Sequence, residues 1–448
     1  MKKLPKFTNC NNLFVLPLLT FLLCSIAYSC QECKPPISCD CEDCIDDRCN
    51  KDNCTCEKDT TDTTSNTVLV DSIVRKPSSA TLLFDASASL RGYLKSSSDD
   101  RFIGVISSFE NMPSKTVVRL YGKEEGNPIE RTDFDRMLNN GKIEWSNESD
   151  LKAMVRSMIG HIDDGDDICF LLTDGILSGS DADIKSSPDK SYNIRMRQKM
   201  SEDLSSMLSE EEGKLCALIA RYNAKFNGKY SCYNNEGKGL INKDRPFFVI
   251  ALGKWGCIKY IEGKLNEAKT ANGITTPYED IVMIGDAYSY QKIKLSAAEG
   301  LNPKGGKLII KKEFRNENVA LSADLGVLPA YMQTDDYMNS NIELYVQHGQ
   351  KAEKVLDKDY YEVSVNSVNG KKILRLNVKS SQLKDSKLTF RLKYTLPEWI
   401  EAKSDDNDLD IATNPAKLGK TFNLKYFISG FTTLHNGKYI KEQSLDFK

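Results

Sequence analysis

Histidine is scarce in this sequence, and the scarcity narrows the chemistry that the chain can perform. The 448 residues include three histidines, His161, His348 and His435. Zinc sites and acid–base catalysis rely heavily on imidazole side chains. Three histidines therefore argue against a His-ligated zinc site and against many enzyme classes. The net charge of −2 indicates none of the basic surface that nucleic-acid binders show, so no nucleic-acid partner is expected. From residue 68 onward, no run is long and apolar enough for a transmembrane helix.

What is present has the composition of a multidomain globular protein. The chain is 40% hydrophobic and 28% charged, which is the usual balance for folded domains. A length of 448 residues exceeds what one compact core supports, so two or three domains are expected.

The N-terminus has the features of an export signal. Three lysines precede a short apolar run at residues 13–23, and small residues then lead to Cys30. This segment resembles a bacterial lipoprotein signal, in which the cysteine is lipidated and becomes the first mature residue. The resemblance implies a signal peptide at residues 1–29 and an exported protein of the cell envelope, anchored to a bacterial membrane through Cys30. Plain secretion is the alternative, and the periplasmic and surface-exposed sides stay open.

Cysteines crowd the stretch that follows. Eight of them lie between residues 30 and 56, in an acidic context that continues into a run of Asp, Thr and Ser. In an exported protein such density favours disulfides, although the CxxC and CxC spacings also suit a metal. We therefore interpret residues 30–67 as a Cys-rich acidic linker or stalk without a buried core. Farther along the chain, Cys216 and Cys232 are a possible disulfide pair.

Residues 68–295 alternate apolar strands with amphipathic helices. Strands are predicted at 79–85, 116–121, 167–175, 246–252 and 281–285. Helices are predicted between them, around 102–109, 151–159, 192–208 and 258–265. This order predicts an α/β domain with a doubly wound, mostly parallel sheet, which binds ligands at the carboxyl ends of its strands. Residues 210–244 interrupt the pattern as a hairpin insertion, with Asn227–Gly228 as its predicted turn.

Beyond residue 295 the period changes to the alternation of half-buried strands. Residues 296–400 predict a small all-β sandwich, immunoglobulin-like only at the level of fold class, with Asn369–Gly370 as a hairpin turn. The C-terminal segment, residues 401–448, contains an apolar stretch that could form a helix packing back on the first domain. The sandwich would then be an insertion; otherwise it is an appendage, and both readings stay open.

Three separate pieces of the α/β region carry oxygen-bearing side chains at predicted strand ends or helix starts. Asp85 ends the first strand and is followed by Ser87 and Ser89, Ser149 opens a helix, and Asp174 lies at the end of the strand at 167–175. Mg²⁺ prefers about six oxygen ligands and dehydrates reluctantly. Two carboxylates and three hydroxyls would hold such a cation and leave a position for an oxygen of a partner. Mg²⁺ is therefore the expected cofactor, with Mn²⁺ or Ca²⁺ as alternatives.

The D-x-S-x-S pattern at residues 85–89 and the T-D-G turn at residues 173–175 resemble the von Willebrand factor A (VWA) family. That family forms a metal-ion-dependent adhesion site from such a loop, a Thr at a helix start and the Asp of the turn. The resemblance implies that Asp85, Ser87, Ser89 and Asp174 are metal ligands. Ser149 stands where the family usually has Thr, and Ser146 or Asn147 could replace it.

The expected function is accordingly a cell-envelope binding, adhesion or assembly module rather than an enzyme. It would capture a protein ligand that offers a carboxylate or similar oxygen to the metal. One alternative is a metal-free structural scaffold of the envelope. A metal-dependent phosphohydrolase is less favoured, because no histidine or glycine-rich phosphate loop accompanies Asp85.

Overall fold

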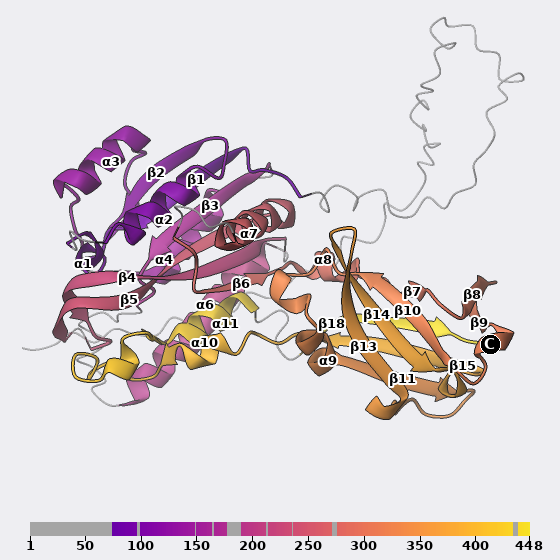
Figure 1. Cartoon of the computed structure of the whole chain (residues 1–448). Helices are drawn as coiled ribbons and strands as arrows, with labels where there is room; N and C mark the ends of the chain where they lie inside the picture. Colours follow the sequence, from indigo (N-terminus) through magenta and orange to yellow (C-terminus); the bar gives the residue numbers. More distant parts are fainter. Residues whose placement is uncertain are drawn as a thin grey trace, which may run out of the picture. The chain divides into compact units, whose positions relative to one another are not determined.

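A computed structural model describes residues 74–95, 99–147, 149–163, 165–176, 190–211, 214–234, 236–270, 276–432 and 438–448. The predicted signal peptide, the lipidation site at Cys30 and the whole Cys-rich stalk at residues 30–67 lie outside these ranges. Within them, the chain forms a mixed α/β arrangement together with several antiparallel sheets (Figure 1).

The α/β part is built on a six-stranded sheet in the order β2-β1-β3-β5-β4-β6 of the described residues. Its strands are β1 (Ser79–Asp85), β2 (Thr116–Tyr121), β3 (Asp167–Thr173), β4 (Cys216–Ser231), β5 (Gly237–Gly253) and β6 (Asp280–Ile284). β1 pairs in parallel with β2 and β3, whereas the β3–β5, β5–β4 and β4–β6 pairs are antiparallel.

The prediction of a mostly parallel sheet is therefore wrong, and the reason is local. The apolar run at 246–252 belongs to β5, which follows β4 through a tight hairpin rather than through a helical crossover. A hairpin returns the chain antiparallel to the preceding strand, whereas a parallel return needs a long connection. The strands were recognisable from their apolar runs, but their relative directions depended on the connection.

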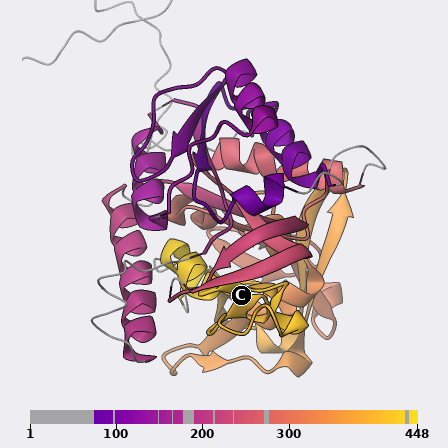
Figure 2. The same cartoon turned by 90° about the vertical axis from the view of Figure 1, so that its left-hand side faces the viewer.

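Helices cover both faces of this sheet. They are α1 (Arg91–Leu94), α2 (Arg101–Glu110), α3 (Arg131–Asn140), α4 (Leu151–Gly160), α6 (Lys190–Glu210), α7 (Trp255–Thr270) and α11 (Leu424–Thr432). Apolar residues of α2, α3 and α7 share a core with one face of the strands. Those of α4, α6 and α11 share a second core with the other face, and α6 runs beside α11 in Figure 2. α2 and α4 bury the apolar residues whose helical spacing predicted these two helices.

The hairpin of β4 and β5 is longer than predicted and turns at a different place. Its pairing continues to Ser231 and Gly237, so the chain reverses after Ser231 rather than at Asn227–Gly228. The register shifts between Phe226 and Gly228, and Asn242 on the opposite strand adopts a left-handed conformation with φ of 51°. Asn227–Gly228 is therefore part of a β-bulge, which inserts extra residues without ending the ladder.

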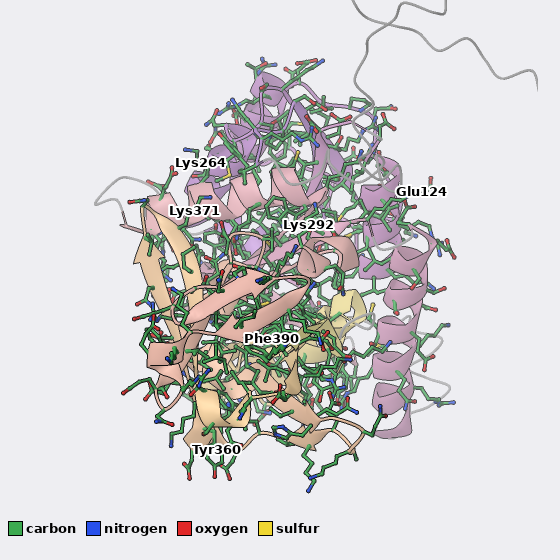
Figure 3. All side chains as sticks on the ribbon, turned by 90° about the vertical axis from the view of Figure 1, so that its right-hand side faces the viewer. Glu124, Lys264, Lys292, Tyr360, Lys371 and Phe390 are labelled. Atoms are coloured by element: carbon green, nitrogen blue, oxygen red, sulfur yellow. The ribbon has the colours of Figure 1, made fainter. Side chains whose placement is uncertain are left out.

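Two four-stranded antiparallel sheets form the β part of the described chain, in the orders β13-β14-β10-β7 and β12-β11-β15-β18. The first contains β13 (Tyr361–Val368), β14 (Lys371–Lys379), β10 (Asn318–Asp324) and β7 (Ser296–Ala297). The second contains β12 (Lys354–Val355), β11 (Ile342–His348), β15 (Ser386–Lys393) and β18 (Tyr439–Asp446). Apolar residues of both sheets share one core, which includes Phe390, while Tyr360 lies at the margin (Figure 3).

The β13–β14 connection confirms the hairpin predicted there. Asn369 and Gly370 have φ angles of 50° and 78°, as a two-residue turn with left-handed central residues requires. The smaller elements around the sandwich are β8 (Leu301–Lys304), β9 (Lys307–Ile310), α8 (Ala287–Gln291) and α9 (Asp335–Asn341).

The C-terminal segment contributes to the cores on both faces of the six-stranded sheet and to the core of the sandwich. After β15 the chain forms α10 (Trp399–Ala402), β16 (Ser404–Asp405), β17 (Thr421–Phe422) and α11. The apolar residues of α11 lie in the core that α4 and α6 also line. The chain then returns as β18, which pairs with β15. Residues 399–432 are thus an excursion between two neighbouring strands of one sandwich sheet.

Candidate metal centre

β1 and β3 bring the two predicted aspartates to one edge of the sheet. The strands are parallel neighbours, with Phe84 opposite Leu172, so Asp85 and Thr173 end them at the same level. Asp174 follows immediately. Both aspartates are buried, with 0% of Asp85 and 3% of Asp174 exposed. The structure therefore places two carboxyl groups side by side at the carboxyl ends of parallel strands.

The loop after β1 turns back on itself so that its serines stay close to Asp85. The backbone N–H of Ser87 donates to Asp85 Oδ1 at 3.0 Å, and the hydroxyls of Ser87 and Ser89 lie 3.0 Å apart in a hydrogen bond. Both serines are buried. The loop thus presents two hydroxyls beside one carboxyl group, as the D-x-S-x-S pattern predicted.

A second segment is tied to this loop by backbone hydrogen bonds. Ser146 N donates to Ala86 O at 2.8 Å, and Ala88 N donates to Ser146 O at 2.7 Å. Three residues later, Ser149 Oγ donates to Asp85 Oδ2 at 3.3 Å. Asp150 caps α4 by accepting from Ala153 N, so Ser149 lies just outside the helix. This hydrogen bond supports Ser149 as the serine that belongs with Asp85.

The T-D-G turn contributes one residue that the sequence reasoning missed. Thr173 Oγ1 donates to Asp85 Oδ2 at 2.8 Å and accepts from Gly175 N at 3.1 Å. Gly175 has a φ of 68°, which favours glycine, and Ile176 N donates to Asp174 Oδ1 at 3.1 Å. Asp174 Oδ2 is buried and has no hydrogen-bond partner in the described part of the chain. The Thr preceding the aspartate was visible in the motif but was read only as part of the turn.

We call the resulting group the strand-end cluster: Asp85, Ser87, Ser89, Ser149, Thr173 and Asp174. The structure brings together all five residues predicted from the sequence and adds Thr173. Four of the five predicted residues are buried, and only Ser149 is partly exposed. The cluster is accordingly reached most directly from the side of Ser149.

The electrostatics of the cluster are unfavourable for two ionised acids. Burial and the nearby charge of Asp174 raise the pKa of Asp85 to about 7, although hydrogen bonds from Thr173 and Ser87 oppose the rise. Burial also raises the pKa of Asp174, although the Ser89 side chain, the backbone N–H of Ile176 and the guanidinium of Arg245 each lower it. Two carboxyl groups that share a buried site cannot both ionise easily unless a positive charge joins them.

The donor set suits a hard cation. Carboxylate and hydroxyl oxygens are the ligands that Mg²⁺ and Ca²⁺ prefer, and Asp174 Oδ2 is a buried oxygen without a partner. Among the described residues, no group of three or more His, Cys, Asp or Glu side chains is arranged so that it could hold a metal ion. The strand-end cluster is of a different kind. It contains two carboxylates, and its other candidate ligands are hydroxyl groups rather than further acids, histidines or cysteines.

The hairpin of β4 and β5 packs against the residues that directly follow the D-x-S-x-S loop. Phe226 lies so close to Gly92, three residues after Ser89, that a Cβ atom there would come 2.2 Å from its ring. Tyr93 OH donates to Pro246 O at 2.5 Å, and its ring stacks on Phe102. The insertion therefore packs against the segment that positions Ser87 and Ser89.

The cysteines of the described chain do not form the disulfide considered above. Cys169, Cys216, Cys232 and Cys257 are all buried, and none of the four forms a disulfide with another. Cys216 begins β4 and Cys232 directly follows its end, so a fully extended strand separates them. A disulfide requires Cα atoms within about 7 Å, which this geometry prevents.

The described helices include none that is long and apolar enough to cross a membrane. Comparison of the chain with family models, with curated proteins and with solved structures finds no match.

Proposed function

We propose that the strand-end cluster holds one divalent cation, in the manner of a VWA-like metal-dependent adhesion site, and that this cation captures a protein partner. Asp85, Ser87, Ser89, Ser149 and Asp174 would supply the ligands directly or through water. Mg²⁺ is the favoured ion, with Mn²⁺ or Ca²⁺ as substitutes. Thr173 would orient Asp85 through its hydrogen bond.

The observation that carries this proposal is the pairing of two buried carboxyl groups, one of which keeps an oxygen without a partner. Folding normally leaves few buried polar atoms unsatisfied, because each costs roughly 1–3 kcal/mol. A divalent cation would offset the repulsion between Asp85 and Asp174 and would give Asp174 Oδ2 a partner. The hydroxyls around it supply further neutral oxygens.

This composition supports capture of a partner more than permanent storage of the ion. Two carboxylates just balance the charge of a divalent cation and the other ligands are neutral hydroxyls, so the loaded site would not repel an additional carboxylate from a partner. When bound, the ion supplies an electrophilic position for that oxygen. Since Ser149 is the partly exposed member of the cluster, we expect the partner to approach on its side. An exported chain anchored through Cys30 would hold the partner at the cell envelope.

A metal-free scaffold is the second candidate, and one observation favours it. Asp85 accepts hydrogen bonds from Ser87 N, Thr173 Oγ1 and Ser149 Oγ, which satisfy its carboxyl group without an ion. In that case the cluster would hold three segments together as a hydrogen-bonded turn. Asp174 Oδ2 is the feature that this alternative leaves unexplained.

Thermal unfolding with and without Mg²⁺ separates the two candidates. A bound ion at 100 times its Kd stabilises a fold by about 2.7 kcal/mol, which corresponds to a rise in Tm of several degrees. Asp174→Asn keeps the acceptor of Ile176 N and replaces the unpartnered oxygen with an amide. We expect this variant to lose the Mg²⁺-dependent rise while becoming roughly 1 kcal/mol more stable without metal, because the repulsion with Asp85 is removed.

The matched control is Asp286→Asn. Asp286 is also buried, but it caps α8 by accepting from Ser289 N and Ser289 Oγ. This variant should lower the Tm and keep the full rise with Mg²⁺. A wild-type Tm that is indifferent to Mg²⁺, Mn²⁺ and Ca²⁺ would favour the scaffold. A cross-linking pulldown from cell envelopes, with and without chelator, then tests whether any partner depends on Asp174.

A further inference from the structure

A segment near the C-terminus packs around the hairpin beside the strand-end cluster. We call it the clasp and define it as residues 404–423, from the start of β16 to the residue before α11. It lies within the excursion between β15 and β18, which pair with each other in the sandwich. The clasp is therefore connected at both ends to one sandwich sheet while its own contacts are with the α/β part.

Two buried arginines of the hairpin bind four consecutive backbone carbonyls of the clasp. Arg245 Nη1 donates to the carbonyls of Lys417, Leu418 and Lys420 at 3.2, 2.6 and 2.9 Å. Arg221 Nη2 donates to the carbonyl of Gly419 at 3.2 Å, and its Nη1 pairs with Asp280 at 2.5 Å. Both arginines are 2% exposed. Charge-assisted hydrogen bonds from these buried guanidinium groups fix the path of the backbone at residues 417–420.

Arg245 also lies close to the T-D-G turn. It stands three residues before Phe248, which pairs with Thr173 at the end of β3. Its guanidinium lies 4.7 Å from the ring centre of Tyr230. Its charge lowers the pKa of Asp174, so the two groups interact electrostatically.

The clasp reaches the T-D-G turn through Thr421. A Cβ atom built on Gly175 would lie 3.6 Å from Thr421 Cγ2 and 3.0 Å from the Phe248 ring. Gly175 is thus packed between β5 and the clasp, directly after Asp174. Displacement of the clasp would remove one wall of the turn that carries a predicted metal ligand.

Further contacts hold the clasp along its length. Asp408 accepts from Tyr230 OH at 2.8 Å and from Tyr233 N at 3.2 Å, and Phe422 stacks on Tyr233. At its end, Asn423 adopts a φ of 59° and accepts from Arg197 Nε at 2.8 Å. These contacts make the clasp an ordered element with one docked position.

We propose that the docked clasp positions the Thr173–Gly175 turn and thereby sets the affinity of the cation site, with Arg245 as its anchor. This inference rests on the proposed function, because it requires a cation at the strand-end cluster. Linkage is reciprocal: if docking of the clasp strengthens cation binding, the bound cation must strengthen docking of the clasp by the same free energy. Cation binding would in this way be coupled to a segment whose two ends belong to the sandwich.

Hydrogen–deuterium exchange of the full wild-type chain, with and without saturating Mg²⁺, tests the reciprocal effect without any substitution. We expect amides of residues 404–423 to exchange about five- to tenfold more slowly with Mg²⁺. The β13–β14 hairpin of the sandwich should exchange at the same rate in both samples. Protection confined to residues 85–89 and 173–176 would overturn the inference and leave the cation site intact.

Arg245→Met provides the second test, measured as the Kd for Mg²⁺ by isothermal titration. Removing a positive charge near a cation site would by Coulomb's law alone tighten cation binding. Loss of the clasp anchor should instead weaken it about five- to tenfold, with faster exchange in residues 404–423. The two explanations thus predict opposite signs.

Arg391→Met is the matched control, because Arg391 also pairs with carboxylates and packs on an aromatic ring, but on the sandwich. It should leave the Kd for Mg²⁺ unchanged. An unchanged or lower Kd in Arg245→Met would overturn the inference while the proposed cation site stands. No Mg²⁺ binding by the wild type would overturn both.

Discussion

The strand-end cluster and the sandwich differ in the burial and pairing of their charged groups. In the cluster, Asp85 and Asp174 are buried beside each other, and one oxygen of Asp174 lacks a hydrogen-bond partner. On the sandwich, acidic side chains pair with basic ones near the surface, as in Arg391–Glu442 at 2.7 Å and Lys371–Asp324 at 3.3 Å. The sandwich follows the ordinary rules of stability, whereas the cluster departs from them. Such departures tend to mark functional sites.

Burial of an acid is not by itself the informative feature. Asp408 is also buried, and burial raises its pKa, yet each of its oxygens accepts a hydrogen bond from the hairpin. Asp174 differs because one oxygen has no partner and a second carboxyl group lies nearby. The comparison therefore depends on unsatisfied oxygens and on like charges rather than on depth alone.

The largest expected effect comes from the sandwich core. Phe390 is 1% exposed and packs between the two sheets, so Phe390→Ala should lower the free energy of unfolding by about 3–5 kcal/mol. Chemical denaturation measures this loss, and Tyr360→Ala at the sandwich margin should have a much smaller effect. If the two regions have separate roles, the Kd for Mg²⁺ of folded Phe390→Ala should equal that of the wild type. A large change in that Kd would show that the contrast between the regions is mistaken.

The sequence was most informative where chemistry and secondary structure coincide. Asp85 and Asp174 each follow an apolar run that could only be a buried strand, and parallel neighbours end at the same edge. Five residues from three distant segments were therefore predicted to meet, and the structure places them together. The same reasoning located Asn369–Gly370 in a turn, because that dipeptide adopts left-handed conformations readily.

The sequence was least informative where long-range pairing decides the outcome. Asn227–Gly228 is the same dipeptide as Asn369–Gly370, which does form a turn. Pairing of β4 with β5 continues past Asn227–Gly228, however, so this dipeptide lies in a β-bulge. The clasp contains no regular apolar pattern, and its position depends on Arg221 and Arg245 binding its backbone carbonyls. Every residue has a backbone carbonyl, so the sequence does not indicate which carbonyls will accept a hydrogen bond from a distant arginine. This contact could therefore not be predicted.

A smaller effect is expected at Gly92, which connects the cluster to the hairpin. A Cβ atom there would lie 2.2 Å from the buried ring of Phe226, so Gly92→Ala should cost about 1–3 kcal/mol through overpacking. Because Gly92 closely follows Ser89, the variant should also reduce the rise in Tm with Mg²⁺. Gly263→Ala in α7 is the control: a Cβ atom meets nothing within 4 Å there, so this variant should be slightly stabilising. An unchanged response to Mg²⁺ in Gly92→Ala would show that the hairpin does not support the D-x-S-x-S loop.

The smallest effect concerns Glu110, which is buried like Asp85 and Asp174 but whose carboxyl group accepts no hydrogen bond from a hydroxyl of the described residues. Glu110 ends α2, and its carboxyl oxygens are buried without hydrogen-bond partners in the described chain, with Arg131 Nε at 3.4 Å. Burial raises the pKa of Glu110 to about 7, against the opposing charge of Arg131. Among the described residues, no hydroxyl group or second carboxylate hydrogen-bonds to its carboxyl group, so it offers a cation no comparable set of ligands.

Glu110 should therefore produce a pH dependence of stability that Mg²⁺ does not change. A carboxyl group whose pKa is raised from 4.5 to about 7 on folding binds more protons in the native state. Its contribution to stability is complete below pH 4.5 and is lost as the pH rises through 7. Glu110→Gln, which mimics the protonated acid, should match the wild type near pH 4.5 and exceed it by about 1–2 kcal/mol near pH 8. Denaturant unfolding at both pH values measures the difference, and a gain that is equal at both would mean that ionisation of Glu110 is not its cause.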